Sequence, residues 1–114
     1  MRRGELWLIN LSPTLGAEMK KTRPAVIVND DEIGLLPLKV IVPVTDWKDR
    51  YAQAPWMVRL EPTPENGLMK VSTADAFQVR AVSEQRFVHC LGNLPSERMD
   101  AIGKALTVVL KLQS

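Results

Sequence analysis

Histidine and cysteine are almost absent from this chain of 114 residues, which has one of each. A lone cysteine forms no internal disulfide, as expected for a reducing compartment. One histidine and one cysteine also supply neither a Cys/His zinc site nor a Cys-His nucleophile pair with the required spacing. We interpret the adjacent His89 and Cys90 as structural residues of an apolar strand.

Long apolar runs and glycine-rich phosphate motifs are missing as well. No run approaches the roughly 20 residues that cross a bilayer, and residues 1–7 lack the apolar core of a signal peptide. Neither a phosphate-binding Gly-rich loop nor a dinucleotide fingerprint occurs. We therefore expect a cytoplasmic protein with no membrane partner, no cofactor and no metal.

Composition and charge are those of an ordinary globular protein, with 46% hydrophobic and 25% charged residues. The length predicts a single domain spanning residues 1–114. A net charge of +2 says little about nucleic acid, but cations gather near the N-terminus, at Arg2, Arg3, Lys20, Lys21 and Arg23. This pattern fits either a local phosphate-attracting face or, more commonly, a solvated charged surface.

The apolar pattern predicts short strands followed by one helix. Strands are expected at residues 5–11, 25–29, 38–44, 56–60, 68–72, 74–82 and 86–91. Pro95 and Ser96 begin a helix in which Met99, Ile102 and Leu106 recur at helical spacing. Strands and helices do not alternate, so we expect a mainly β fold: a small, strongly bent antiparallel sheet or barrel of six or seven strands, with the amphipathic C-terminal helix packed on it.

Arg23 and Thr45 are the polar residues that the strand pattern makes most interesting. Arg23 is expected just before the second strand and Thr45 just after the third, which Pro43 is expected to end or to place at a sheet edge. If these two strands pair antiparallel, the two side chains face one spot. An arginine fork and a hydroxyl there suit phosphate oxygens and a developing phosphorane. The alternative is a surface arginine and a turn threonine.

Other side chains with a possible RNA role are Gln78, Arg80 and Trp47. Gln78 and Arg80 are expected on one face of one strand, where they contact RNA or cover a solvated face. Trp47 lies in a polar loop and is the better candidate for stacking a base. Trp7 and Trp56 are interpreted as core or dimer-interface residues.

Several short motifs follow one another over nearly the whole chain: Arg3-Gly4-Glu5-Leu6-Trp7, residues 11–18, residues 23–28, Pro43-Val44-Thr45, Gly67-Leu68, Gln78-Val79-Arg80 and Leu91-Gly92-Asn93-Leu94. In this order and spacing they resemble the MazF/PemK toxins. The resemblance implies an SH3-like barrel that works as a homodimer. It implies a metal-independent endoribonuclease that cuts single-stranded mRNA at short sequences by attack of the 2′-hydroxyl, and a cognate antitoxin whose C-terminal segment blocks the RNA groove.

The resemblance also implies roles for individual residues. Arg23 and Thr45 match the catalytic arginine and threonine of the family, and Gln78 and Arg80 match a Gln-x-Arg near the RNA groove. Glu18 matches the acidic residue of the loop after the first strand, and Lys20 and Lys21 are interpreted as RNA contacts at the groove edge.

Phe77 departs from the family pattern, since some members carry a carboxylate immediately before the glutamine of Gln-x-Arg. Asp75 is two residues earlier, and the role is not transferred to it. We favour electrostatic stabilisation, rather than proton transfer, for Arg23. Two alternatives stay open at this level: a CcdB-like gyrase poison, although the C-terminus lacks the bulky aromatic of that toxin, and a non-catalytic RNA-binding module.

Overall fold

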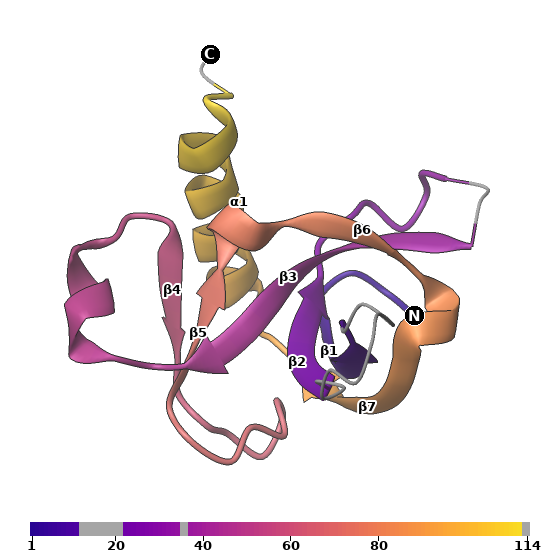
Figure 1. The fold of residues 1–114 in the computed structure, drawn as a ribbon, viewed down its shortest axis with the longest axis horizontal. Coiled ribbons are helices and arrows are strands. Elements are labelled where there is room, and N and C mark those ends of the chain that lie inside the picture. Colours follow the sequence, from indigo (N-terminus) through magenta and orange to yellow (C-terminus); the bar gives the residue numbers. More distant parts are fainter. Residues whose placement is uncertain (12–21, 35–36, 113–114) are drawn as a thin grey trace, which may run out of the picture.

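The computed structural model describes residues 1–11, 22–34 and 37–112, and Figure 1 shows their arrangement. These residues form seven strands, three 3₁₀ turns and one α-helix. The elements are β1 (Glu5–Asn10), β2 (Thr22–Ile27), β3 (Leu38–Asp46), η1 (Asp49–Gln53), β4 (Met57–Leu60), β5 (Ser72–Asp75), η2 (Ala76–Gln78), β6 (Arg80–Ser83), η3 (Glu84–Arg86), β7 (Phe87–Asn93) and α1 (Ser96–Leu110). The expected mainly β fold with a C-terminal helix is confirmed.

β3 organises the antiparallel sheet, whose strand order is β4-β5-β3-β2-β1-β7. Its first half pairs with β6 and its second half with β5, while β2 pairs along its other edge. In Figure 1, β1, β2, β6 and β7 curl around one end of β3, and β4 and β5 lie at the other end. The η3 turn connects β6 to β7. In the sheet order these two strands are not neighbours, so the sheet is strongly bent but open.

The two faces of the sheet bury different sets of apolar side chains, as the period of two along a strand requires. Val26, Val42 and Val44 lie on the face that packs against Ile102 and the rest of α1. The odd-numbered Ala25 and Ile41 lie on the opposite face, in a smaller cluster. The members of that second cluster are Ile9, Ala25, Ile27, Ile41 and Val82, with Trp7, Leu11 and Phe87 packed against it.

α1 begins where the sequence predicts, at Ser96. Pro95 occupies the position before its first residue with φ −69°, which suits a helix start. Its apolar stripe buries Met99, Ile102 and Ala105 against the sheet. After Leu110 the chain turns through Lys111, whose φ is +54°, and the Leu112 N–H donates to the Thr107 carbonyl, which caps the helix. Within residues 1–11, 22–34 and 37–112, no helix combines the length and apolar character needed to cross a membrane.

Pro43 was expected to end β3 or to mark an edge, and this expectation is wrong. β3 continues through Pro43 to Asp46 in the middle of the sheet. Val28 N–H donates to Val40 O, so the backbone groups of Val40 point toward β2. The direction alternates from one residue to the next along β3. The nitrogen of Pro43, three residues later, therefore points away from β2, toward the other edge of β3. On that edge β5 ends and η2 begins opposite Pro43, so the missing N–H costs no ladder hydrogen bond.

Two strand predictions also need correction. Residues 68–71 are not a strand, and the continuous strand expected at 74–82 is broken by η2. Asp75 causes the break, because its carboxylate accepts from the Phe77 backbone N–H at 3.1 Å and caps the 3₁₀ turn. Cys90 and His89 were interpreted as structural residues of an apolar strand, but both are exposed on β7.

The N-terminal end of the chain is fastened through Glu5. One carboxylate oxygen of Glu5 accepts from the Trp7 indole N–H at 2.9 Å and from the Arg2 backbone N–H at 3.1 Å, and it lies 3.8 Å from the N-terminal ammonium. Burial on its own would raise the pKa of this carboxyl. The hydrogen bonds from Trp7 and Arg2, with the positive charges of the N-terminus and Arg2, bring the pKa below its ordinary value.

Candidate active site

Arg23 and Thr45 meet on neighbouring strands of the sheet. Both lie inside strands, Arg23 in β2 and Thr45 in β3, rather than beyond the strand ends as expected from the sequence. The register pairs Ala25 with Pro43, and its continuation places Arg23 opposite Thr45. This is a non-hydrogen-bonded pair, the type in which cross-strand side chains are closest. The Arg23 Nη1 group donates to Thr45 Oγ1 at 3.2 Å, so the predicted juxtaposition is present.

The strands on either side hold this pair in place. Arg23 lies opposite Ile9 of β1, and Thr45 lies opposite Thr73 of β5. Ile9 and Thr73 are completely buried, whereas Arg23 and Thr45 are partly exposed. The site therefore offers a guanidinium and a hydroxyl from rigid inner strands to a ligand in solvent. These are the donors that bind phosphate oxygens well.

Arg80 and Trp47 share the sheet face of Thr45. Arg80 in β6 is exposed and lies directly opposite Ile41 of β3, an odd-numbered position on the same face as Thr45. Trp47 follows β3 and extends its ladder, because its backbone N–H donates to the Val71 carbonyl at 3.1 Å. Its indole N–H donates to Asp49 at 3.3 Å, so Trp47 is an anchored aromatic of this face.

Gln78 does not lie on one strand face with Arg80, and that part of the sequence interpretation is wrong. Gln78 belongs to the η2 turn, and its side-chain amide donates to the Asp75 carboxylate at 2.7 Å. The same carboxylate caps the turn, so the buried Asp75 is engaged twice by its own segment. Phe77 is exposed and packs edge-on against Trp56, with ring centroids 5.9 Å apart.

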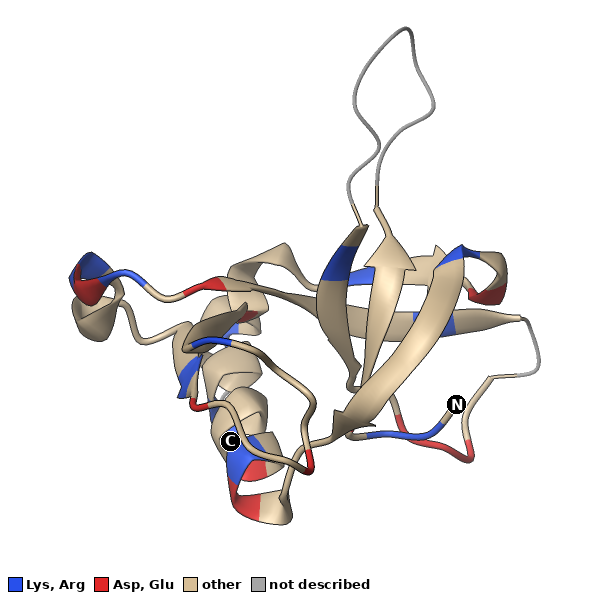
Figure 2. Ribbon diagram, turned by 90° about the horizontal axis from the view of Figure 1, so that it is seen from below, with Lys and Arg blue, Asp and Glu red and all other residues tan. Residues whose placement is uncertain are grey.

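Glu18, Lys20 and Lys21 lie outside the described residues. In the part of the chain that the structure describes, Lys and Arg (blue) and Asp and Glu (red) are spread over several elements, as Figure 2 shows. In this described part, no three His, Cys, Asp or Glu side chains gather as a metal-binding group. Of the five cations behind the expected basic face, Arg2, Arg3 and Arg23 are described, and Lys20 and Lys21 are not.

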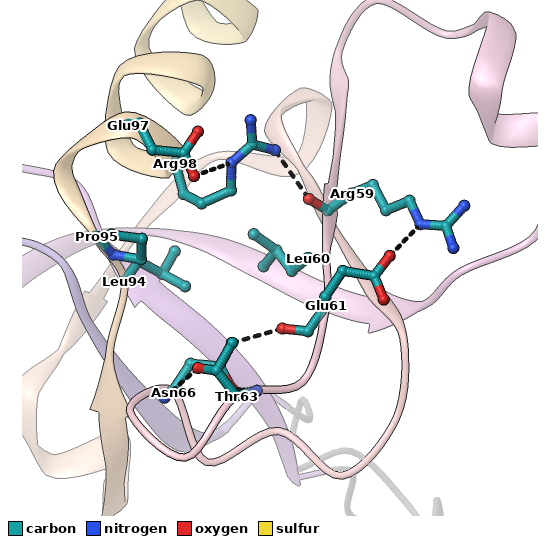
Figure 3. Close-up of a pocket in the computed structure, with 9 residues that line it drawn as sticks. All are labelled: Arg59, Leu60, Glu61, Thr63, Asn66, Leu94, Pro95, Glu97 and Arg98. Carbon is teal, nitrogen blue, oxygen red and sulfur yellow. Dashed lines mark hydrogen bonds and ion pairs between the residues drawn. The ribbon is translucent and has the colours of Figure 1, made fainter.

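A separate cavity of about 220 Å³ lies at the start of α1, and neither Arg23 nor Thr45 lines it (Figure 3). Its polar groups hold neighbouring segments together. The buried Asn66 donates to the Glu61 carbonyl at 2.8 Å, and Arg98 donates to the Arg59 carbonyl at 3.0 Å. We interpret this cavity as a junction between the residue 61–67 loop and α1.

Sequence reasoning missed one cationic side chain on the same sheet as the pair. Arg59 in β4 lies opposite Thr73, and its guanidinium carbon is 5.1 Å from the centre of the Trp47 ring. The position of Arg59 on this face depends on the register between β4, β5 and β3. Since the sequence pattern put β5 at the wrong residues, it gave no signal that Arg59 lies near the pair.

Comparison with known proteins identifies the family of the chain. A family model described as a PemK-like, MazF-like toxin of type II toxin-antitoxin systems matches residues 2–110. The chain belongs to this toxin family. It is 31% identical to "Endoribonuclease MazF9" of Mycobacterium tuberculosis, over 100% of this chain and 99% of that protein. It is 26% identical to "Endoribonuclease EndoA" of Bacillus subtilis, over 98% of this chain and 96% of that protein.

Solved structures of MazF-type proteins share the fold. A mycobacterial endoribonuclease in complex with its cognate antitoxin superposes with a TM-score of 0.78 at 19% identity, over 100% of this chain and 98% of that one. A MazE–MazF complex from Deinococcus radiodurans gives a TM-score of 0.78 at 22% identity, over 99% of this chain and 97% of that one. At these identities the structures establish the fold, and the family assignment comes from the sequence comparisons.

Proposed function

We propose that this chain is the toxin of a type II toxin-antitoxin system and acts as an endoribonuclease on single-stranded RNA, with Arg23 and Thr45 as its catalytic pair. The observation that carries the assignment of the pair is the 3.2 Å contact between Arg23 Nη1 and Thr45 Oγ1 on a solvent-accessible sheet face. The family match and the relatives that are named endoribonucleases support the activity.

The pair suits transesterification of the RNA backbone. In the reaction we propose, a 2′-hydroxyl attacks the adjacent phosphorus, the bond to the 5′-oxygen breaks, and a 2′,3′-cyclic phosphate and a 5′-hydroxyl remain. The 2′-hydroxyl loses a proton and the leaving 5′-oxygen gains one. Arg23 stays charged and donates to the phosphorane oxygens, and the Thr45 hydroxyl supplies a second donor. No metal enters this scheme.

Substrate and partner contacts follow from the same hypothesis. Trp47, Gln78 and Arg80 contact RNA from the described part of the chain. Glu18, Lys20 and Lys21, which lie outside the described residues, also contact RNA in this proposal. In this proposal the toxin works in the cytoplasm as a homodimer. A cognate antitoxin blocks it, and structural neighbours solved as toxin–antitoxin complexes support this partner.

The test is a cleavage assay with purified protein and a long single-stranded RNA in EDTA, with the cut ends mapped by primer extension. We expect cuts at a short recurring sequence, and loss of cutting in Arg23→Ala. Lys104→Ala is the matched control, because Lys104 is an exposed cation on α1. No cutting by the wild type, or equal cutting by Arg23→Ala, contradicts the proposal. RNA binding without cutting would instead indicate a binding module.

A further inference from the structure

One row of directly opposed residues crosses four strands of the sheet. Arg59 of β4 pairs with Thr73 of β5, and Thr73 pairs with Thr45 of β3. Thr45 accepts the hydrogen bond from Arg23 of β2. Directly opposed residues of antiparallel strands point to the same face of a sheet. From β4 to β2 this row therefore has an arginine at each end and the Thr45 hydroxyl between them, and beyond Arg23 it continues to Ile9 of β1.

The neighbours of Arg59 confirm which face it occupies. Val58 and Leu60 are buried in the cluster that packs against α1, so Arg59, which lies between them, faces away from the helix. Met57 has the same parity as Arg59, and its sulfur accepts from Thr73 Oγ1 at 3.4 Å. Arg59 is thus on the face that carries Arg23 and Thr45.

The guanidinium of Arg59 has two partners that hold it in place, Glu61 and Trp47. Its Nε group donates to Glu61 at 2.7 Å, and its guanidinium carbon lies 5.1 Å from the centre of the Trp47 ring. Trp47 is itself fixed by Asp49 and by edge contact with Tyr51, at 6.0 Å between ring centroids. The Arg59 side chain nevertheless keeps 50% of its surface exposed. An arginine that lies over an aromatic ring and keeps half of its side chain exposed is well arranged to bind a phosphate.

We propose that Arg59, held by Trp47 and Glu61, forms a second phosphate-binding subsite for the RNA strand, away from the scissile phosphate. This inference rests on the proposed function and adds a contact to it. Three strand spacings separate β4 from β2, which is about 14 Å. In one strand of a duplex, successive phosphates are roughly 3.4 Å apart along the axis, and we take this spacing for the bound RNA. The subsite therefore engages a phosphate about four nucleotides from the one at Arg23 and Thr45, and sets the length of RNA that binds fully.

The binding test uses single-stranded RNA in which a 2′-deoxy nucleotide at the mapped cut blocks cleavage. Affinity is measured by fluorescence anisotropy for a long oligonucleotide and for a short one that ends two nucleotides from the cut on each side. We expect Arg59→Ala to weaken binding of the long RNA about tenfold and to leave the short RNA unchanged. Arg59→Lys keeps the charge but loses the planar fork, so an intermediate loss is expected. Lys104→Ala is expected to change neither.

The salt dependence gives a readout that does not require cleavage. For single strands, each phosphate contact contributes about 0.7 to the slope of log affinity against log salt concentration. Arg59→Ala should lower the slope for a long RNA by about that amount, and Lys104→Ala should not. An unchanged slope, or equal weakening of long and short RNA, overturns the subsite even if the wild type cuts RNA. A reduced slope in a protein that cuts nothing supports the subsite and contradicts the nuclease.

Discussion

Removing the Thr45 hydroxyl while keeping the shape of the side chain is the sharpest perturbation of the proposed active site. Thr45→Val preserves a β-branched residue in β3 and removes the oxygen that accepts from Arg23 at 3.2 Å. Because Arg23 is partly exposed, water can replace the lost acceptor, and we expect the fold to be retained. The effect of the substitution should therefore fall on catalysis.

The size of the effect follows from the role of a preorganised donor. Removing one such donor costs about 10²- to 10³-fold in rate. We expect about 10²-fold for Thr45→Val, which is about 2.7 kcal/mol of transition-state stabilisation, and about 10³-fold for Arg23→Ala. Independent contributions would multiply to about 10⁵-fold in the double variant. Since the two side chains touch, we expect the double variant to stay within about tenfold of Arg23→Ala alone.

The assay is single-turnover cleavage of a labelled RNA at saturating protein, so that the rate reports the chemical step rather than binding. Thr73→Val is the matched control, because it makes the same chemical change in the adjacent strand, at a side chain with 0% exposed surface. Its cleavage rate should equal that of the wild type. A wild-type rate for Thr45→Val, or a double variant at the full product of the single effects, would refute a pair that acts as a unit.

Three further predictions concern stability, each measured by denaturant unfolding. Glu5→Gln should lower the free energy of unfolding by about 1 kcal/mol at neutral pH. Because the pKa of Glu5 is lowered in the folded state, this stabilisation is lost as pH falls through that pKa, and the two proteins should become equally stable in acid. A stability difference that stays constant with pH would contradict this prediction. Gly67→Ala should lower the free energy of unfolding by about 2 kcal/mol or more, since Gly67 has φ +69° and an added Cβ would lie 2.3 Å from the Leu91 carbonyl oxygen. An unchanged stability would show that the turn can shift. Ile102→Ala should cost about 3 kcal/mol because Ile102 is only 1% exposed, and a loss below about 1 kcal/mol would mean that α1 packs loosely.

The parts of the fold that the sequence predicts are those with a clear apolar period. The stripe containing Met99 and Ile102 marks α1, and the run at 25–28 marks the buried part of β2. The meeting of Arg23 with Thr45 is predictable because it needs only one antiparallel pairing between consecutive strands. For these features local pattern and tertiary packing agree.

The remaining features depend on contacts between segments that the sequence does not place. The carboxylate of Asp75 interrupts a segment with a regular period of two, because it hydrogen-bonds to its own turn instead of continuing the ladder. Cys90 is apolar in type but lies on the exposed side of a strand at one end of the sheet order. Arg59 reaches the face of the active site only through the pairing of β4 with β5 and of β5 with β3.

The positions of the two arginines in the sheet predict how their variants should differ. Arg23 lies on β2, which has a paired strand on each side, whereas Arg59 lies on β4, the last strand of the sheet order. An inner strand fixes a donor before substrate arrives, which favours contacts made to the transition state. We expect Arg59, half-exposed on the outer strand and away from the scissile phosphate, to contribute equally to the ground state and the transition state. Variants of Arg23 should therefore lower kcat, and variants of Arg59 should raise KM at unchanged kcat. A raised KM for Arg23 variants together with a lowered kcat for Arg59 variants would reverse the roles that we infer for the two arginines.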